Sequence, residues 1–414
     1  MDSGQDAPGC TGFRLDSMEC QKTGRYYSMK TLITIFLFVI AFAFDATVPE
    51  ASGDLRWQLS FWLSVLAVGY GLYHVLTAKL SRPPIIFYPV LALAVIAVLS
   101  CCWSICPRWS LISLSRFLPY VVLFFAVYCL RDKNWYRTLL WAIAAGVGIN
   151  CMIGIGQYYR VDIWLVNYFK CSVPPAGSLA NRNLLASYLV LTLPVVVYLA
   201  WSARNWLERI TTGVIIILGG LMLFYTDSRA SWLAAGCEVV FFASWLLLRR
   251  EKRLFTIALI IATVLAVGYA LRNLPNDESF KIRAAYNINS LAIVKDHPLG
   301  VGVGAWKLAY PQYAYALVKT PPGGFGETLR PSRAHNDLMQ AFVELGILGG
   351  LAYIVIFFML IQTAWKTGGR MVLCLSTAVV GLGANALMDF PLQLPLAPIV
   401  FWTLAGVTVG LSKK

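Results

Sequence analysis

The sequence has few of the residues that bind metal ions. It contains three histidines, His74, His297 and His335, and it has no His-x-x-x-His, no Asp-x-Asp and no pair of Cys-x-x-Cys elements. Protein metal sites are usually built from His, Cys and carboxylate ligands at such spacings. We therefore expect no metal site.

The ten cysteines define no disulfide framework. Four lie inside apolar runs, where cysteine behaves as a small hydrophobic residue: Cys129, Cys151, Cys237 and Cys374. Four others lie near the face that we assign below as external, where an oxidising compartment would allow one bridge: Cys101, Cys102, Cys106 and Cys171. The pairing cannot be read from the sequence.

A dinucleotide-binding motif is also lacking. Gly300, Gly302 and Gly304 loosely match the glycine pattern of such motifs, but they follow Asp296-His297-Pro298 instead of a predicted strand. We expect a tight turn at these glycines and no cofactor.

Charged residues are scarce, at 13% of the 414 positions, whereas hydrophobic residues make up 58%. The apolar positions come in long blocks, which is typical of helical membrane proteins. We predict an all-α, polytopic integral membrane protein with about twelve transmembrane helices. The predicted spans are 31–48, 57–75, 84–102, 112–130, 138–157, 184–201, 211–226, 230–248, 254–272, 337–362, 371–388 and 396–411.

Basic residues fall in every second connection between these spans, as in the run Arg249-Arg250-Glu251-Lys252-Arg253. By the positive-inside rule, those connections and both termini are cytoplasmic. The sequence has 34 Lys and Arg against 20 Asp and Glu, and we attribute this excess mainly to the orientation of the protein in the membrane. We expect no nucleic-acid partner.

The predicted spans divide the chain into four parts. We expect residues 1–30 to be a disordered leader, and Met29-Lys30 raises the alternative that translation starts there. Residues 31–272 hold helices one to nine, and 273–336 form one large external loop with an amphipathic helix. Residues 337–414 hold the last three helices and a cytoplasmic tail.

The stretch Ser332–Gly350 joins the external loop to an apolar helix. Asn336, Gln340 and Glu344 are spaced four apart and form one polar ridge on that helix. Polar side chains at membrane depth face a bundle interior or a wet cavity. His335 at the helix start is therefore a candidate site residue, and the alternative is a capped helix with an incidental histidine.

Two external connections carry arginine close to the membrane boundary. Arg229 lies in the short hairpin 226–231, where a guanidinium is costly unless it meets an anion, pairs with Asp227 or reaches the interface. Arg182 and Asn183 precede the sixth span, where ordinary helix capping is the alternative to ligand binding.

The large loop adds further basic residues. Segment 279–295 is predicted to be an amphipathic helix in the headgroup plane, with Arg283 directed to the cavity that His335 borders or to lipid phosphate. Segment 311–333 is irregular, aromatic and basic, with Lys319, Arg330 and Arg333. Its composition fits both a binding segment for sugar or lipid phosphate and a mobile lid.

The ordered set of these features resembles the O-antigen ligase and polymerase superfamily of bacterial inner-membrane glycosyltransferases. The resemblance covers residues 31–411 and is carried first by Ser332–Gly350, where an external loop ends in His-Asn followed by a Leu, a Glu and glycines. Asn181-Arg182-Asn183, Ser228-Arg229, and Arg283 ahead of Asp296-His297-Pro298 precede it in the expected order. The chain most resembles an O-antigen ligase.

This resemblance implies transfer of a glycan from undecaprenyl diphosphate to a hydroxyl of a lipid-linked acceptor at the periplasmic face. The leaving diphosphate needs fixed cations, and arginine binds phosphate bidentately and stays charged. We expect Arg229 and Arg283 to stabilise the diphosphate, and His335 to act as general base or to orient the acceptor. The further predicted substrate-binding residues are Arg182, Asn183, Lys319, Arg330, Arg333 and Asn336.

The acceptor stays open at this stage. Lipid A-core oligosaccharide would make the protein a ligase, another undecaprenyl-linked repeat a polymerase, and a pilin-like protein an oligosaccharyltransferase. Membrane lipids are the remaining expected partner. A transporter should show ionisable residues through several spans and an internal repeat, whereas the charge here is concentrated at one face.

Overall fold

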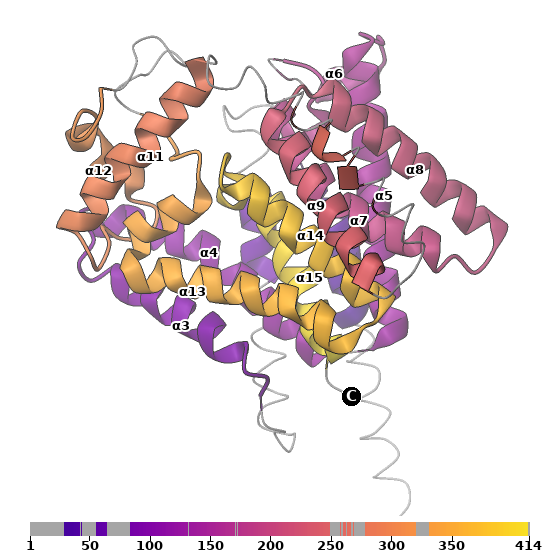
Figure 1. Cartoon of the computed structure of the whole chain (residues 1–414), viewed down its shortest axis with the longest axis horizontal. Helices are drawn as coiled ribbons and strands as arrows, with labels where there is room; N and C mark the ends of the chain where they lie inside the picture. Colours follow the sequence, from indigo (N-terminus) through magenta and orange to yellow (C-terminus); the bar gives the residue numbers. More distant parts are fainter. Residues whose placement is uncertain are drawn as a thin grey trace, which may run out of the picture.

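In the computed structural model, the described residues form helices joined by turns, without a strand (Figure 1). The description covers residues 29–41, 43, 55–63, 83–130, 132–169, 171, 173–248, 278–319 and 331–412, with isolated positions between 257 and 268. The labelled helices are α3 (Phe87–Ser100), α4 (Pro107–Cys129), α5 (Lys133–Tyr158), α6 (Trp164–Tyr168), η1 (Gly177–Leu179), α7 (Arg182–Trp201), α8 (Trp206–Tyr225), α9 (Arg229–Leu248), α11 (Glu278–Asp296), α12 (Trp306–Tyr313), α13 (Asp337–Thr367), α14 (Arg370–Ala386), η4 (Pro391–Gln393) and α15 (Leu396–Ser412). The predicted all-α class is confirmed.

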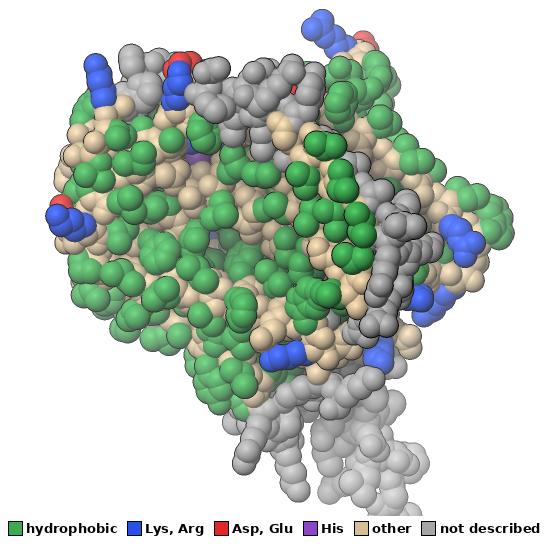
Figure 2. Space-filling model, viewed as in Figure 1, with side chains coloured by type: hydrophobic (Ala, Val, Ile, Leu, Met, Phe, Trp, Pro, Cys, Tyr) green, Lys and Arg blue, Asp and Glu red, His purple; other side chains and the backbone are tan. Residues whose placement is uncertain are grey.

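Six described helices are long and apolar enough to cross a membrane: α4, α5, α7, α8, α9 and α13. Four shorter apolar helices are Met29–Ile40, α3, α14 and α15. Apolar side chains cover most of the face in Figure 2, with Lys and Arg at its margins. These features confirm a polytopic membrane protein.

The number of twelve spans stays a prediction. Most of spans 254–272 and 57–75, and leader residues 1–28, lie outside the described residues.

α15 lies at the centre of the helix bundle. Its Phe401 and Trp402 are almost completely buried. Trp402 meets Phe124 of α4 edge to face at 5.9 Å between ring centroids, and Phe401 stacks on Phe357 of α13 at 5.0 Å. Aromatic pairs of this kind stabilise a structure beyond the burial of their apolar area. These contacts join α15 to α4 and to α13.

Buried polar side chains hold the loop before α7. Arg56, which is 1% exposed, donates to Ser178 Oγ over 2.8 Å and to Ile40 O over 3.0 Å. Asn150 Oδ1 accepts from Ser178 N over 2.9 Å, and Gln157 Oε1 accepts from Gly177 N over 2.8 Å. Because each buried backbone group is satisfied, the loop presents the start of α7 in one fixed position.

A short hydrogen-bond chain joins α7, α14 and α9. Ser187 Oγ donates to Asn385 Oδ1, and Asn385 Nδ2 donates to Ser231 Oγ, each over 2.8 Å. Ser187, Ser231 and Asn385 are buried and lie within about one and a half turns of Arg182, Arg229 and the end of α14, respectively. Polar side chains often bridge helices in membranes in this way. The chain therefore fixes the spacing of these three helix ends.

The described part of the large loop has its own small core, which lies beside α13 (Figure 1). Tyr286 of α11 packs edge to face on Tyr310 at 5.2 Å, and Trp306 stacks on Tyr310 at 4.7 Å. Buried Asn289 accepts from Val318 N over 2.9 Å and donates to Ala314 O over 2.7 Å. A helix is present where we expected one at 279–295, and its buried residues Ile282, Tyr286 and Ile293 face this core. Ile288 and Leu291, which we expected on its apolar face, are exposed.

Gly346 interrupts α13. Its φ of 72° and ψ of −174° form a combination that is essentially restricted to glycine. The turn 298–302 replaces part of the lost helix bonding, since Val301 N donates to Val343 O over 2.9 Å. A Cβ on Gly346 would lie 2.5 Å from Pro298 O. The missing side chain of Gly346 therefore admits this turn beside the helix.

Candidate functional site

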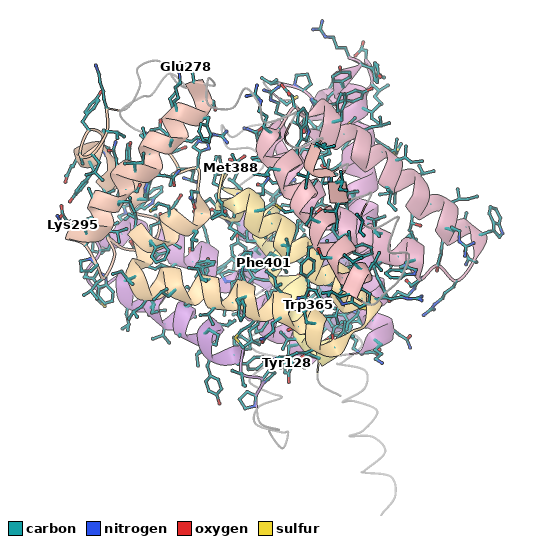
Figure 3. The ribbon with its side chains drawn as sticks, in the orientation of Figure 1. Tyr128, Glu278, Lys295, Trp365, Met388 and Phe401 are labelled. Carbon is teal, nitrogen blue, oxygen red and sulfur yellow. The ribbon has the colours of Figure 1, made fainter. Side chains whose placement is uncertain are left out.

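A cavity of about 450 Å³ lies between the starts of α7 and α9, the middle of α11 and the end of α14. Five of the site residues predicted from the sequence line it: Arg182, Asn183, Arg229, Arg283 and His335. They come from four segments that are far apart in the chain. Met388, which also lines the cavity, lies between α11 and α9 in Figure 3.

The cavity is suited to an anion. Three guanidinium groups line it, against one carboxylate from Asp227. The N-termini of α7 and α9 also open onto it, since Arg182 and Arg229 are their first residues. Helix N-termini carry partial positive charge and unpaired N–H groups. The electrostatic field of the backbone therefore adds to that of the arginines.

Some polar atoms at this cavity lack a protein partner within the described residues. Arg283 Nη1 donates to Met388 O over 2.8 Å, which fixes the side chain, but its buried Nε has no hydrogen-bond partner there. Asn287 Oδ1 is also buried without a hydrogen-bond partner among the described residues, although Asn287 Nδ2 donates to Arg283 O. Buried unpaired polar groups are costly, and a ligand in the cavity can satisfy them.

His335 reaches the cavity from a left-handed backbone conformation, with φ 54°. Its Nδ1 lies 3.4 Å from Asp389 Oδ1, and its ring meets Phe390 edge to face at 4.7 Å. The His335 side chain is 17% exposed and that of Asp389 is 2% exposed. The imidazole is therefore held by an aromatic ring on one side and by a buried carboxylate on another.

Burial lowers the pKa of His335 below its ordinary value, and the nearby charges of Arg283 and Arg333 lower this pKa further. The carboxylate of Asp389 acts in the opposite direction. The imidazole is thus neutral near neutral pH. A neutral imidazole whose Nδ1–H faces Asp389 carries a lone pair on Nε2, which can accept a proton.

Asp389 is the site residue that our reading of the sequence missed. It lies in the short connection between α14 and η4, 54 positions after His335. Its position in the sequence could have revealed it, because this one carboxylate lies between two apolar helices, in Leu387-Met388-Asp389-Phe390-Pro391. An ionisable residue at such a place needs a partner.

The other predicted substrate-binding residues lie elsewhere. Asn336 Oδ1 accepts from Met339 N over 3.0 Å, so this side chain caps α13. Arg333 lines a second cavity, on the other side of the segment that carries His335. Lys319 is exposed at the end of a described segment, and Arg330 lies outside the described residues.

No group of three or more His, Cys, Asp or Glu side chains among the described residues could hold a metal ion. The described cysteines, including Cys101, Cys102, Cys106 and Cys171, have free thiols.

Residues 213–354 match the family model described as O-antigen ligase. This segment of the chain is similar to the O-antigen ligase family. The resemblance seen in the sequence is thereby confirmed, and the family implies ligation of lipid-linked glycans by glycosyl transfer. The O-antigen ligase segment includes Arg229, Arg283 and His335, whereas Arg182 and Asp389 lie outside it. No curated protein matches the chain.

Proposed function

We propose that the protein is an O-antigen ligase that transfers a glycan from undecaprenyl diphosphate to lipid A-core oligosaccharide. The proposed site is the cavity of Arg229, Arg283 and His335, at the periplasmic face of the bacterial inner membrane. In this orientation both termini are cytoplasmic.

One observation carries the proposal. Arginines from three separate segments, Arg182, Arg229 and Arg283, line one cavity together with a histidine that is neutral near neutral pH. A diphosphate leaving group needs fixed positive charge, and an attacking hydroxyl needs a proton acceptor. The cavity offers both, and Arg283 Nε has a free donor there.

The proposed reaction is a single displacement at the anomeric carbon. The acceptor oxygen attacks that carbon, and the bond from the carbon to the phosphate oxygen breaks with its electron pair on undecaprenyl diphosphate. His335 Nε2 takes the hydroxyl proton, or holds the hydroxyl in line while the proton moves to solvent. Arg229 and Arg283 stabilise the charge that develops on the diphosphate. Attack opposite to the leaving group inverts the anomeric centre.

The experiment is expression of the chain in a Gram-negative host that lacks its own ligase but makes a compatible lipid-linked glycan. We expect long glycans on lipid A-core with the wild type, and roughly 10²- to 10⁴-fold less transfer with His335→Ala at equal protein level. His297→Ala is the matched control, because His297 follows α11 and does not line the cavity.

The lipopolysaccharide and the undecaprenyl-linked pool are resolved separately by size. Long chains found only on the lipid carrier would make the protein a polymerase. Near-normal transfer by His335→Ala would remove His335 from the chemistry, and no change in either pool would reject both activities for the glycan supplied.

A further inference from the structure

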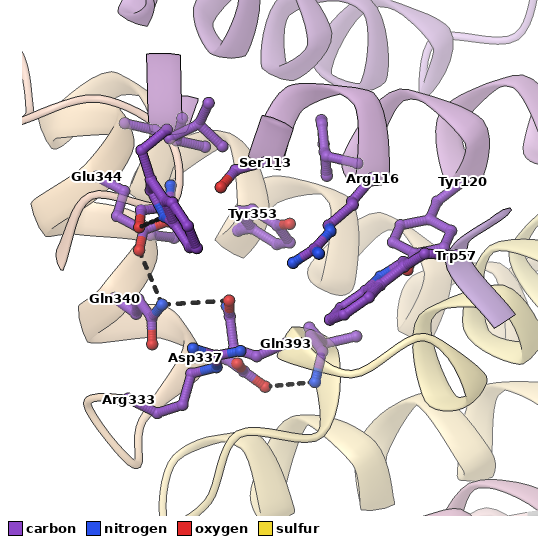
Figure 4. A pocket seen from close by; sticks show the side chains of 17 residues that line it. Trp57, Ser113, Arg116, Tyr120, Arg333, Asp337, Gln340, Glu344, Tyr353 and Gln393 are labelled. Atoms are coloured by element: carbon purple, nitrogen blue, oxygen red, sulfur yellow. Dashed lines mark hydrogen bonds between the residues drawn. The ribbon is translucent and has the colours of Figure 1, made fainter. Parts of the chain in front are cut away.

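A second cavity, of about 110 Å³, is lined by residues of α4, α13 and the segment before α13 (Figure 4). Arg333 and Asp337, two positions before and after His335, both line it, whereas His335 lines the first cavity. The left-handed backbone at His335 accompanies this divergence of neighbouring side chains. The two cavities are therefore adjacent and share one wall.

The second cavity differs from the first in its polar groups. Arg116 and Arg333 line it together with two carboxyl groups, those of Asp337 and Glu344. The walls thus hold hydrogen-bond donors and acceptors together, and the amides of Gln340 and Gln393 add to both kinds. The arginine-rich first cavity favours an anion, whereas this mixed lining suits a ligand that both donates and accepts hydrogen bonds.

The carboxylate of Glu344 already accepts hydrogen bonds from other groups of the protein. Its carboxylate accepts from Gly304 N over 2.8 Å and from Gln340 Nε2 over 2.8 Å. The bond from Gly304 N ties α13 to the turn that precedes α12, and the bond from Gln340 lies within α13. Glu344 thus shapes the wall and leaves ligand binding to its neighbours.

Asp337 has an acceptor to spare. Its Oδ2 accepts from Leu392 N over 2.8 Å, which fixes the carboxyl group, and the bond is drawn in Figure 4. Its Oδ1 is buried and has no hydrogen-bond partner among the described residues. Asp337 is 5% exposed and lines the cavity. An unpaired carboxylate oxygen at such a place is costly unless a donor arrives.

The indole rings of Trp57 and Trp109 and the hydroxyl groups of Tyr120 and Ser113 also line the cavity. The Arg116 guanidinium lies 3.8 Å from the ring centroid of Trp57, whose Nε1 donates to Tyr120 Oη over 2.9 Å. Trp109 is fixed by its bond to Gly304 O, and Ser113 also faces the cavity. Flat apolar rings beside fixed polar groups suit a ring that has apolar C–H faces and hydroxyl edges.

We propose that this second cavity binds a neutral sugar ring of one glycan substrate, with Asp337 Oδ1 accepting hydrogen bonds from its hydroxyls. The inference rests on the proposed function and extends it, because a sugar held here lies next to the wall that carries His335. The ring belongs either to the acceptor or to the donor glycan, and the two sources predict different kinetics.

The test uses Asp337→Asn in the full-length protein reconstituted in liposomes. The amide oxygen can still accept from Leu392 N, so an NH₂ group then faces the cavity in place of the acceptor. We expect KM for one glycan substrate to rise about tenfold, with the affinity for undecaprenyl diphosphate that carries no sugar unchanged. Ser115→Ala is the control, because Ser115 is exposed on the same α4 and does not line the cavity.

A rise in KM for the acceptor assigns the site to the acceptor sugar, and a rise in KM for the donor assigns it to the donor sugar. Both KM values within twofold of wild type would overturn the proposal. Weaker binding of undecaprenyl diphosphate alone, with both sugar-dependent KM values unchanged, would also overturn it and assign the cavity to the anion site.

A second measurement does not depend on transfer. Trp57 and Trp109 line the cavity, so binding of methyl glycosides of glucose, galactose or N-acetylglucosamine should change tryptophan emission. We expect the change to weaken in Trp57→Phe and Asp337→Asn and to persist in Ser115→Ala. If the wild type transfers no glycan but binds a glycoside in this way, the proposed function fails and the sugar site stands. No emission change with any of the three glycosides would overturn the sugar site.

Discussion

The Nδ1 atom of His335 lies 3.4 Å from Oδ1 of Asp389, although 54 positions separate the two residues in the chain. Asp389 does not line the arginine-rich cavity, whereas His335 does. The carboxylate can therefore fix the orientation and tautomer of the imidazole without touching a substrate, which makes Asp389 a positioning residue.

Replacing this carboxylate should reduce catalysis less than removing the histidine. In Asp389→Asn we expect kcat to fall roughly 10- to 100-fold, because the imidazole loses the partner that selects its tautomer. Turnover of lipid-linked donor by the reconstituted protein measures the effect. Asp296→Asn is the matched control, since Asp296 is exposed and bonds only to Tyr313 among the described residues. Full activity in Asp389→Asn would show that His335 needs no orienting carboxylate.

The pH profile separates this role from a merely structural one. Because the pKa of His335 is lowered, its neutral form persists at neutral pH, and kcat/KM should fall only as the pH drops below the ordinary histidine value of about 6.5. Asp389 raises this pKa, so Asp389→Asn should move the acidic limb to lower pH. A limb that moves to higher pH, or that survives in His335→Ala, would contradict the assignment of the base.

The arginines of the first cavity should not tolerate lysine. Arg229→Lys and Arg283→Lys keep the charge but lose the planar fork, and in Arg283 also the bond from Nη1 to Met388 O. We expect kcat/KM to fall roughly 10- to 100-fold in each. Arg204→Lys serves as control, because Arg204 is exposed between α7 and α8, away from the cavity. Wild-type kinetics in Arg229→Lys would favour simple snorkelling of Arg229 to the membrane interface.

The break in α13 should depend strictly on glycine. Gly346→Ala places a Cβ at φ 72°, 2.5 Å from Pro298 O, so we expect a loss of about 1–3 kcal/mol from the backbone conformation alone. Thermal unfolding in detergent measures the change. Gly213→Ala is the control, because no atom lies within 4 Å of a Cβ built there and the helix favours alanine. Equal melting temperatures for the two variants would show that the break is not required.

The sequence was sufficient for the all-α membrane class and for five residues that line the first cavity. Arg182 and Arg229 stand out because charge at the ends of apolar helices is costly and therefore informative. Asp389 was missed because its partner is distant in the chain and its own segment carries no recognisable pattern. The contact arises from the packing of α13 against α14, which brings the residues before α13 next to those after α14.

Arg333 illustrates a second limit. It was predicted to bind substrate and lies two positions before His335, but the two side chains line different cavities. The divergence accompanies a positive φ at a histidine, a conformation that few residues other than glycine adopt. Gly346 shows the same limit, because an apolar run with a glycine does not reveal whether the helix continues or breaks.

The junction between the turn 298–302 and α13 is made by main-chain atoms, with Val301 N on Val343 O and Gly302 N on Glu344 O. Main-chain pairing depends on backbone conformation, so the positive φ angles of Gly300, Gly302 and Gly346 define this joint. The two halves of the interrupted helix are therefore bridged by a turn that lies about forty positions earlier in the chain, and a change of conformation in the turn should alter the bend in α13.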